Sequence, residues 1–130
     1  MRSKRKSFQT IMLIMMVFAA LGTATALAAE QWTPISGNEF NMVAYGKVIV
    51  QSVDFSAGGF VLYSFGPGGD QDCRSKSEIK VDGSFYATIL GNETGARITF
   101  KVVGPDGAVY DMAKEIRFQA DATKADLIIN

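Results

Sequence analysis

The sequence predicts an all-β fold, an antiparallel β-sandwich of about seven short strands. Apolar and polar residues alternate with a period of two over residues 96–103, which is the pattern of a half-buried strand. Turn signals recur roughly every 8–12 residues, the spacing typical of sandwiches. No amphipathic segment of helical length follows residue 28. A small barrel is the alternative architecture.

The first 28 residues are predicted to be a secretory signal peptide. Four basic residues lie within positions 1–6, an apolar run covers 11–21, and small residues follow. Ala26 and Ala28 form the A-x-A site, so we expect cleavage before Ala29 and a single mature domain over residues 29–130. The alternative is an uncleaved membrane anchor, because no charge interrupts residues 10–29. Both alternatives place the domain across the inner membrane, in the periplasm or outside the cell.

Cleavage would leave an acidic domain. Of the 13 basic residues, four lie in the predicted leader, so nine remain against 13 acidic residues, a net charge of −4. Nucleic-acid binding needs a basic face, so this class is not expected. Attraction to anionic lipid is not expected either, and the mature domain is predicted not to be embedded in a membrane.

The strands are predicted in order along the chain. Residues 41–50 form the first, in which Gly46 indicates a bulge or a close backbone approach. The apolar run 59–65 suits a central strand, and the polar alternation of 73–81 suits an exposed face or a sheet edge. The remaining strands are 85–90, 96–103, the two ends of 109–118 around a bend at 112–115, and 127–129.

Three turns are predicted to connect neighbouring strands as hairpins. Glycine, proline, asparagine and aspartate favour the backbone angles of tight turns. The turns lie at residues 81–84, 91–95 and 104–107, which leaves no room for crossover helices. The connections are therefore expected to be antiparallel, as in an Ig-like sandwich. On strand 96–103, we expect Ile98, Phe100 and Val102 to face the interior, and Arg97, Thr99 and Lys101 to face solvent or the rim.

Several segments together resemble a known family. They are Asn41-Met42 with Gly46, Asp54, Gly59-Phe60-Val61, Cys73-Arg74, and the stretch 86–101 (YATILGNETGARITFK). In this order they are similar to a β-sandwich module found in exported bacterial surface proteins. The similarity covers about residues 40–120 and is strongest over 86–101, whereas Gly59 and Ser75 depart from the family pattern. The resemblance implies a non-catalytic module without a defined ligand.

Catalysis is not expected from the residue types present. The sequence contains no histidine, which excludes Ser-His, Cys-His and His-zinc sites. A pair of carboxylates could in principle cleave a glycosidic bond, but most acidic residues flank glycines in turns. No glycine-rich phosphate loop precedes a helix.

Two weak binding features remain, and no cofactor is expected beyond a possible calcium ion. Asp70 and Asp72 form an Asp-x-Asp loop whose oxygens could bind calcium, although a solvated loop is the favoured explanation. Exposed aromatic rings can stack on sugars, and the aromatic set that could include such a platform is Trp32, Phe40, Tyr45, Tyr63, Tyr86 and Tyr110. Of these, Trp32, Tyr63 and Tyr86 are the candidate ligand-binding residues. Aromatic residues on an alternating sheet more often belong to the core. Trp32 is expected either to plug one end of the sandwich or to be exposed.

The only cysteine, Cys73, excludes an intramolecular disulfide. It is expected to be a small, half-buried strand residue, with a disulfide to a partner chain as the alternative. The sequence as a whole favours a small exported, non-enzymatic structural or interaction module that binds a protein or a glycan at the bacterial cell envelope. The alternative is a carbohydrate-binding module, which exposed coplanar aromatic residues on one sheet face would favour.

Overall fold

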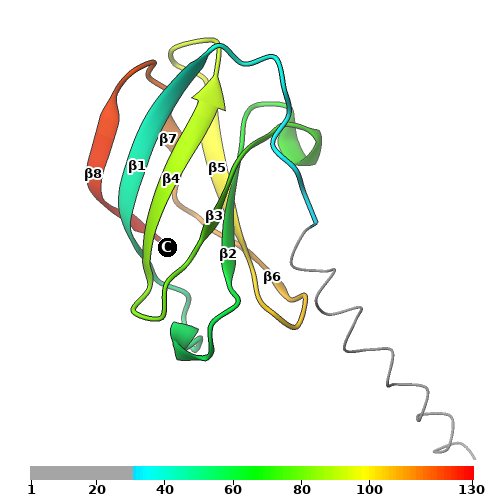
Figure 1. Cartoon of the computed structure of the whole chain (residues 1–130), viewed down its shortest axis with the longest axis vertical. Coiled ribbons are helices and arrows are strands. Elements are labelled where there is room, and N and C mark those ends of the chain that lie inside the picture. Colours follow the sequence, from blue (N-terminus) through cyan, green and yellow to red (C-terminus); the bar gives the residue numbers. More distant parts are fainter. Residues whose placement is uncertain (1–30) are drawn as a thin grey trace, which may run out of the picture.

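The computed structural model describes residues 31–130, and within this range two sheets pack face to face (Figure 1). One sheet has three strands and the other has five. The predicted β-sandwich is therefore confirmed. The first sheet, called sheet A below, has the order β4-β1-β8, and the second, sheet B, has the order β3-β2-β5-β6, with β7 paired to β5.

Sheet A is built around β1 (Phe40–Val48). β4 (Ser84–Gly91) runs antiparallel to it on one side, and β8 (Thr123–Ile129) runs parallel to it on the other. The parallel pair departs from the expected antiparallel arrangement. Parallel neighbours cannot be joined by a hairpin, and here β1 and β8 are separated in the chain by all the other strands, β2 to β7.

Sheet B contains β2 (Val61–Phe65) between β3 (Cys73–Glu78) and β5 (Arg97–Val103). β6 (Val109–Asp111) and the short β7 (Ile116–Arg117) both pair with β5. The predictions of a central strand at 59–65, an edge strand at 73–81 and a break at 112–115 are confirmed. Two short 3-10 turns, η2 (Phe55–Ala57) and η3 (Gly69–Gln71), lie in the connections.

The hairpin predictions are confirmed for one turn and wrong for two. Residues 104–107 join the paired strands β5 and β6. Residues 81–84 and 91–95 do turn the chain, but β4 belongs to sheet A whereas β3 and β5 belong to sheet B. Both turns therefore pass between the sheets. Turn-forming residues satisfy the local backbone in either case and do not specify which sheet the next strand joins.

The main core lies between the two sheets. Ile98, Phe100 and Val102 are at most 2% exposed, which confirms the predicted inward face of β5. A second apolar cluster lies on the outer face of sheet B. It contains Tyr63, Phe65, Cys73 and Val103, with Trp32 and Val61 packed against it.

Gly46 occupies the bulge where the register between β1 and β8 shifts. A Cβ atom at this position would lie 1.9 Å from the backbone oxygen of Leu127. Only glycine permits this approach, so the predicted bulge and close contact are both confirmed.

Candidate functional site

A pair of tyrosines dominates the outer face of sheet A. Tyr45 on β1 is directly opposite Tyr86 on β4, and alternation along both strands directs the two side chains away from the core. Their ring centroids are 6.0 Å apart and their planes differ by 7°. Tyr86 is 61% exposed and Tyr45 37%. The pair therefore presents two parallel aromatic rings to solvent.

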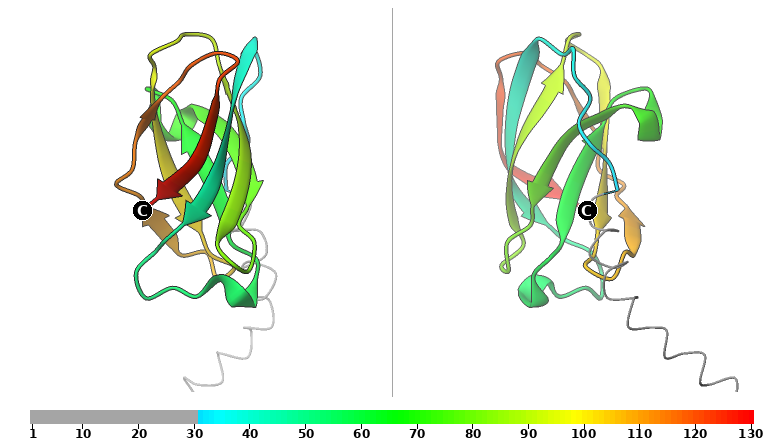
Figure 2. Two further views of the ribbon diagram at one scale, coloured as in Figure 1. Left: turned by 90° about the vertical axis from the view of Figure 1, so that its left-hand side faces the viewer. Right: turned by 45° about the vertical axis from the view of Figure 1, so that its right-hand side comes forward.

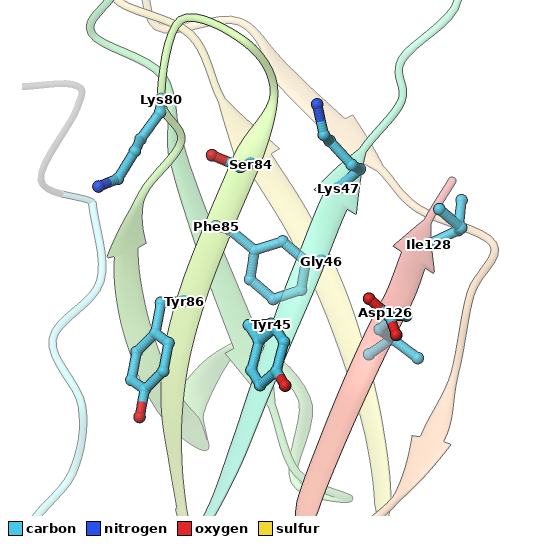
Figure 3. A pocket seen from close by; sticks show the side chains of 10 residues that line it. Tyr45, Gly46, Lys47, Lys80, Ser84, Phe85, Tyr86, Asp126 and Ile128 are labelled. Carbon is cyan, nitrogen blue, oxygen red and sulfur yellow. The ribbon is translucent and has the colours of Figure 1, made fainter.

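The tyrosine pair belongs to an open groove of about 580 Å³ (Figure 3). This volume lies within the range of small-molecule sites. In the left view of Figure 2, no other described segment crosses in front of the three strands of sheet A. The groove is lined by Tyr45, Gly46, Lys47, Lys80, Ser84, Phe85, Tyr86, Asp126, Leu127 and Ile128. We call these residues the sheet A groove.

One end of the groove is basic and hydroxylic. Figure 3 shows Lys80 and Lys47 on either side of Ser84, at the end of the groove beyond the two rings, with the Lys47 ammonium directed away from them. Lys47 Nζ donates to the backbone oxygen of Asp82 at 3.0 Å and lies 3.9 Å from its carboxylate. The Ser84 hydroxyl and amide both donate to Asp82 and hold the pKa of its carboxyl below the usual value. Asp82 is thus kept ionised and fixes this turn.

The other side of the groove comes from β8. Asp126 adopts a φ of 56°, a left-handed conformation that aspartate tolerates better than most residues. Two residues further on, Ile128 is 42% exposed and lies opposite Lys47. A carboxylate and an apolar side chain therefore border the tyrosines on this side (Figure 3).

The three predicted ligand-binding aromatics do not form one surface. Tyr86 lies in the sheet A groove, whereas Tyr63 is fully buried in the cluster on sheet B. Trp32 packs edge-on against Tyr63 and Phe65, with ring centroids 5.0 and 5.1 Å apart. Trp32 therefore neither plugs the sandwich end nor is fully exposed; it covers the outer face of sheet B.

Tyr45 was not among the three candidate residues, although the sequence around it indicated an exposed position. The residue alternates outward on a predicted strand, between Ala44 and the bulge at Gly46. What was missing was the register that places it opposite Tyr86. Strand pairing between distant segments fixes such a pair, and neither segment encodes it alone.

Asp70 and Asp72, the predicted calcium ligands, each contact a different cation. Asp72 accepts two hydrogen bonds from the Arg74 guanidinium, at 2.7 and 3.1 Å, and one from the Gly68 amide at 3.0 Å. Asp70 Oδ1 lies 3.1 Å from Lys101 Nζ. Within residues 31–130, no group of three or more possible metal ligands is present. Calcium binding by these two residues remains a prediction.

Cys73 is more deeply buried than expected. Its exposed fraction is 2%, and burial raises the pKa of its thiol. The side chain packs in the apolar cluster on sheet B. A disulfide to a partner would first require this cluster to open.

The predicted signal peptide and its cleavage site at Ala26, Ala28 and Ala29 lie outside the described residues. Over residues 31–130, no helix has the length and apolar character needed to cross a membrane. Comparison with protein families, curated proteins and solved structures found no match to this chain. The resemblance to exported bacterial β-sandwich modules therefore remains a prediction.

Proposed function

We propose that this chain is a small exported, non-enzymatic binding module of the periplasm or cell surface, and that it binds carbohydrate in the sheet A groove. The observation that carries this proposal is the exposed, parallel pair Tyr45 and Tyr86. The C–H face of a pyranose ring stacks on such an aromatic surface, and a few polar groups then fix its orientation. The proposal excludes catalysis because the sequence contains no histidine and offers no other recognised catalytic arrangement.

The composition of the groove favours a sugar over a protein partner. Protein interfaces depend on aromatic or arginine anchors in well-packed, fully desolvated pockets. Here the two rings are parallel to each other and exposed on an open sheet face, among Lys47, Lys80, Ser84 and Asp126. Polar groups beside an aromatic surface match the mixed hydroxyl and C–H character of sugars. A purely structural role would leave the exposure of Tyr45 and Tyr86 unexplained.

A glycan array followed by calorimetry tests the proposal. We expect Tyr45→Ala and Tyr86→Ala to abolish binding of the array hits, and Tyr86→Phe to retain it because the ring remains. Thr88→Ala is the matched control, since Thr88 is exposed on the same strand and face as Tyr86. Binding that survives both alanine variants would contradict the proposed site. A protein partner recovered in place of any glycan, and lost in the same variants, would replace sugar with protein as the ligand class.

A further inference from the structure

The basic end of the sheet A groove points to the kind of sugar. We propose that the preferred ligand is an acidic glycan, whose pyranose rings stack on Tyr45 and Tyr86 and whose carboxylate binds Lys80 and Lys47. This inference rests on the proposed function and narrows it to one class of carbohydrate. Its basis is the placement of two exposed lysines in the lining of the groove that contains the aromatic pair (Figure 3).

Lys80 has a free ammonium group for such a contact. Within residues 31–130, no carboxylate forms an ion pair with its side chain, whereas Lys47, Arg74 and Arg97 each pair with one carboxylate and Lys101 pairs with two. The residue is exposed and its backbone is fixed by the turn, in which its amide donates to the Ser84 carbonyl at 2.9 Å. The turn therefore places an exposed ammonium group on the border of the groove.

The ion pair between Lys47 and Asp82 is weak. Its ammonium is 3.9 Å from the carboxylate, and the two side chains are 52% and 63% exposed. Exposed pairs of this kind contribute little, so the interaction with Asp82 does not prevent a second anion from binding. The ammonium has three donors, and the backbone oxygen of Asp82 takes one of them at 3.0 Å.

The opposite border of the groove determines how the sugar is oriented. Asp126 would repel a carboxylate but accept hydrogen bonds from sugar hydroxyls. A uronic acid that directs its carboxylate to the lysine end and its hydroxyls toward Asp126 satisfies both sides. A free phosphate is a poorer match, because it could bind the lysines but has no C–H face to stack on Tyr45 and Tyr86.

The net negative charge of the domain does not favour an acidic ligand at long range. Recognition must therefore come from the two lysines at close contact, where screening by salt is weaker than between distant exposed charges. This makes the individual lysines decisive for affinity.

The test compares oligogalacturonate with its methyl ester, which removes the charge and keeps the sugar. The protein is purified from cells that express the full chain, and binding is measured by calorimetry. We expect the acid to bind at least about tenfold more tightly than the ester, the effect of one charge-assisted hydrogen bond. Lys80→Gln and Lys47→Gln should each reduce this preference, and the double variant should remove it. Lys76→Gln, an exposed lysine on β3 of sheet B, is the matched control.

The outcomes separate this inference from the proposed function. Equal binding of acid and ester, lost in Tyr86→Ala, would overturn the acidic preference and leave carbohydrate binding in place. An acid preference that Lys76→Gln weakens as much as Lys80→Gln would be nonspecific charge attraction and would also overturn it. No binding of either probe, together with no hit among neutral glycans, would overturn both proposals.

Discussion

Lys101 Nζ, on β5 of sheet B, lies 5.6 Å from the centroid of the Trp32 ring. It therefore holds residues 31–39, which precede β1 and are called the N-terminal segment below, against the outer face of sheet B. The same ammonium is 3.1 Å from Asp70 and 3.3 Å from Asp111, and 5.8 Å from the Phe65 ring. Lys101 was expected to face solvent or the rim of the sandwich, and its side chain is 25% exposed. One cation thus connects β5, the loop at η3, β6 and the N-terminal segment.

Replacing Lys101 with alanine should destabilise the fold by about 1–2 kcal/mol, because it removes a partly desolvated cation–π contact and two charge-assisted hydrogen bonds. Lys124→Ala is the control, since the Lys124 ammonium donates to a neutral side chain, Gln119, at 3.0 Å. Urea melts monitored by tryptophan fluorescence measure both. Equal midpoints for the two variants would contradict a clamping role for Lys101.

Truncation of Phe100 to alanine should cost about 3–5 kcal/mol, the usual range for a fully buried ring. Phe100 is 2% exposed in the core between the sheets. Arg97→Ala, on the outward face of the same strand, should leave the denaturation midpoint nearly unchanged. A larger effect at Arg97 than at Phe100 would contradict the observed register of β5.

The faces of this strand were predictable because alternation depends on local sequence alone. Ile98, Phe100 and Val102 repeat every second residue, and burying one face of a sheet fixes the register. The bulge at Gly46 was predictable for a similar reason, since a glycine inside an apolar strand marks a close approach. Both features follow from residues that lie next to one another in the chain.

Other features required pairings between distant segments. Turns at 81–84 and 91–95 contain the residues of hairpins, yet their strands enter different sheets. The end of β4 depends on such a distant contact. A Cβ atom at Gly91 would lie 2.9 Å from the ring of Phe118, which directly follows β7 in the chain. The tyrosine pair, the environment of Lys101 and the burial of Tyr63 likewise depend on contacts that no single segment contains.

Substitution of Gly46 by alanine should destabilise the protein by about 3 kcal/mol or more, since the added methyl group would overlap the backbone of β8. Because β8 borders the sheet A groove, its displacement should also weaken ligand binding. Asn41→Ala, an exposed site on β1, is the control for stability. Thermal melts compare the two, and a stable Gly46→Ala variant would contradict the bulge.

Stability should fall in acid partly through Asp72. The Arg74 hydrogen bonds lower the pKa of this carboxyl; burial opposes them, and the Gly68 amide adds to the lowering. Because the folded pKa lies below the unfolded value near 3.8, the contribution is complete above that value and is lost as the pH falls through the folded pKa. Asp72→Asn should therefore be less stable near neutral pH and lose less stability on acidification. Urea melts from pH 2 to 7 compare the slope of Asp72→Asn with that of the wild-type protein.

Cys73 offers a direct measure of how firmly Trp32 covers the outer face of sheet B. The thiol is 2% exposed, and burial raises its pKa, so both access and thiolate formation are restricted in the folded protein. The Ile35 amide donates to the Cys73 carbonyl at 3.1 Å, which attaches the same N-terminal segment to β3. Opening of this segment should therefore control the reactivity of the thiol.

We expect native Cys73 to react with a maleimide much more slowly than the unfolded chain does. Trp32→Ala should accelerate labelling at least about tenfold. The lost aromatic contacts should lower the free energy of local opening by about 1.4 kcal/mol or more, which corresponds to this factor. Tyr86→Ala, which removes an aromatic residue from the opposite sheet, should leave the labelling rate unchanged. Cys73→Ser should still fold but lose about 1–3 kcal/mol, since a hydroxyl replaces the thiol in an apolar cluster. Rapid labelling of the wild-type protein under native conditions would mean that the N-terminal segment does not protect this face, and that Cys73 is accessible to a partner's thiol.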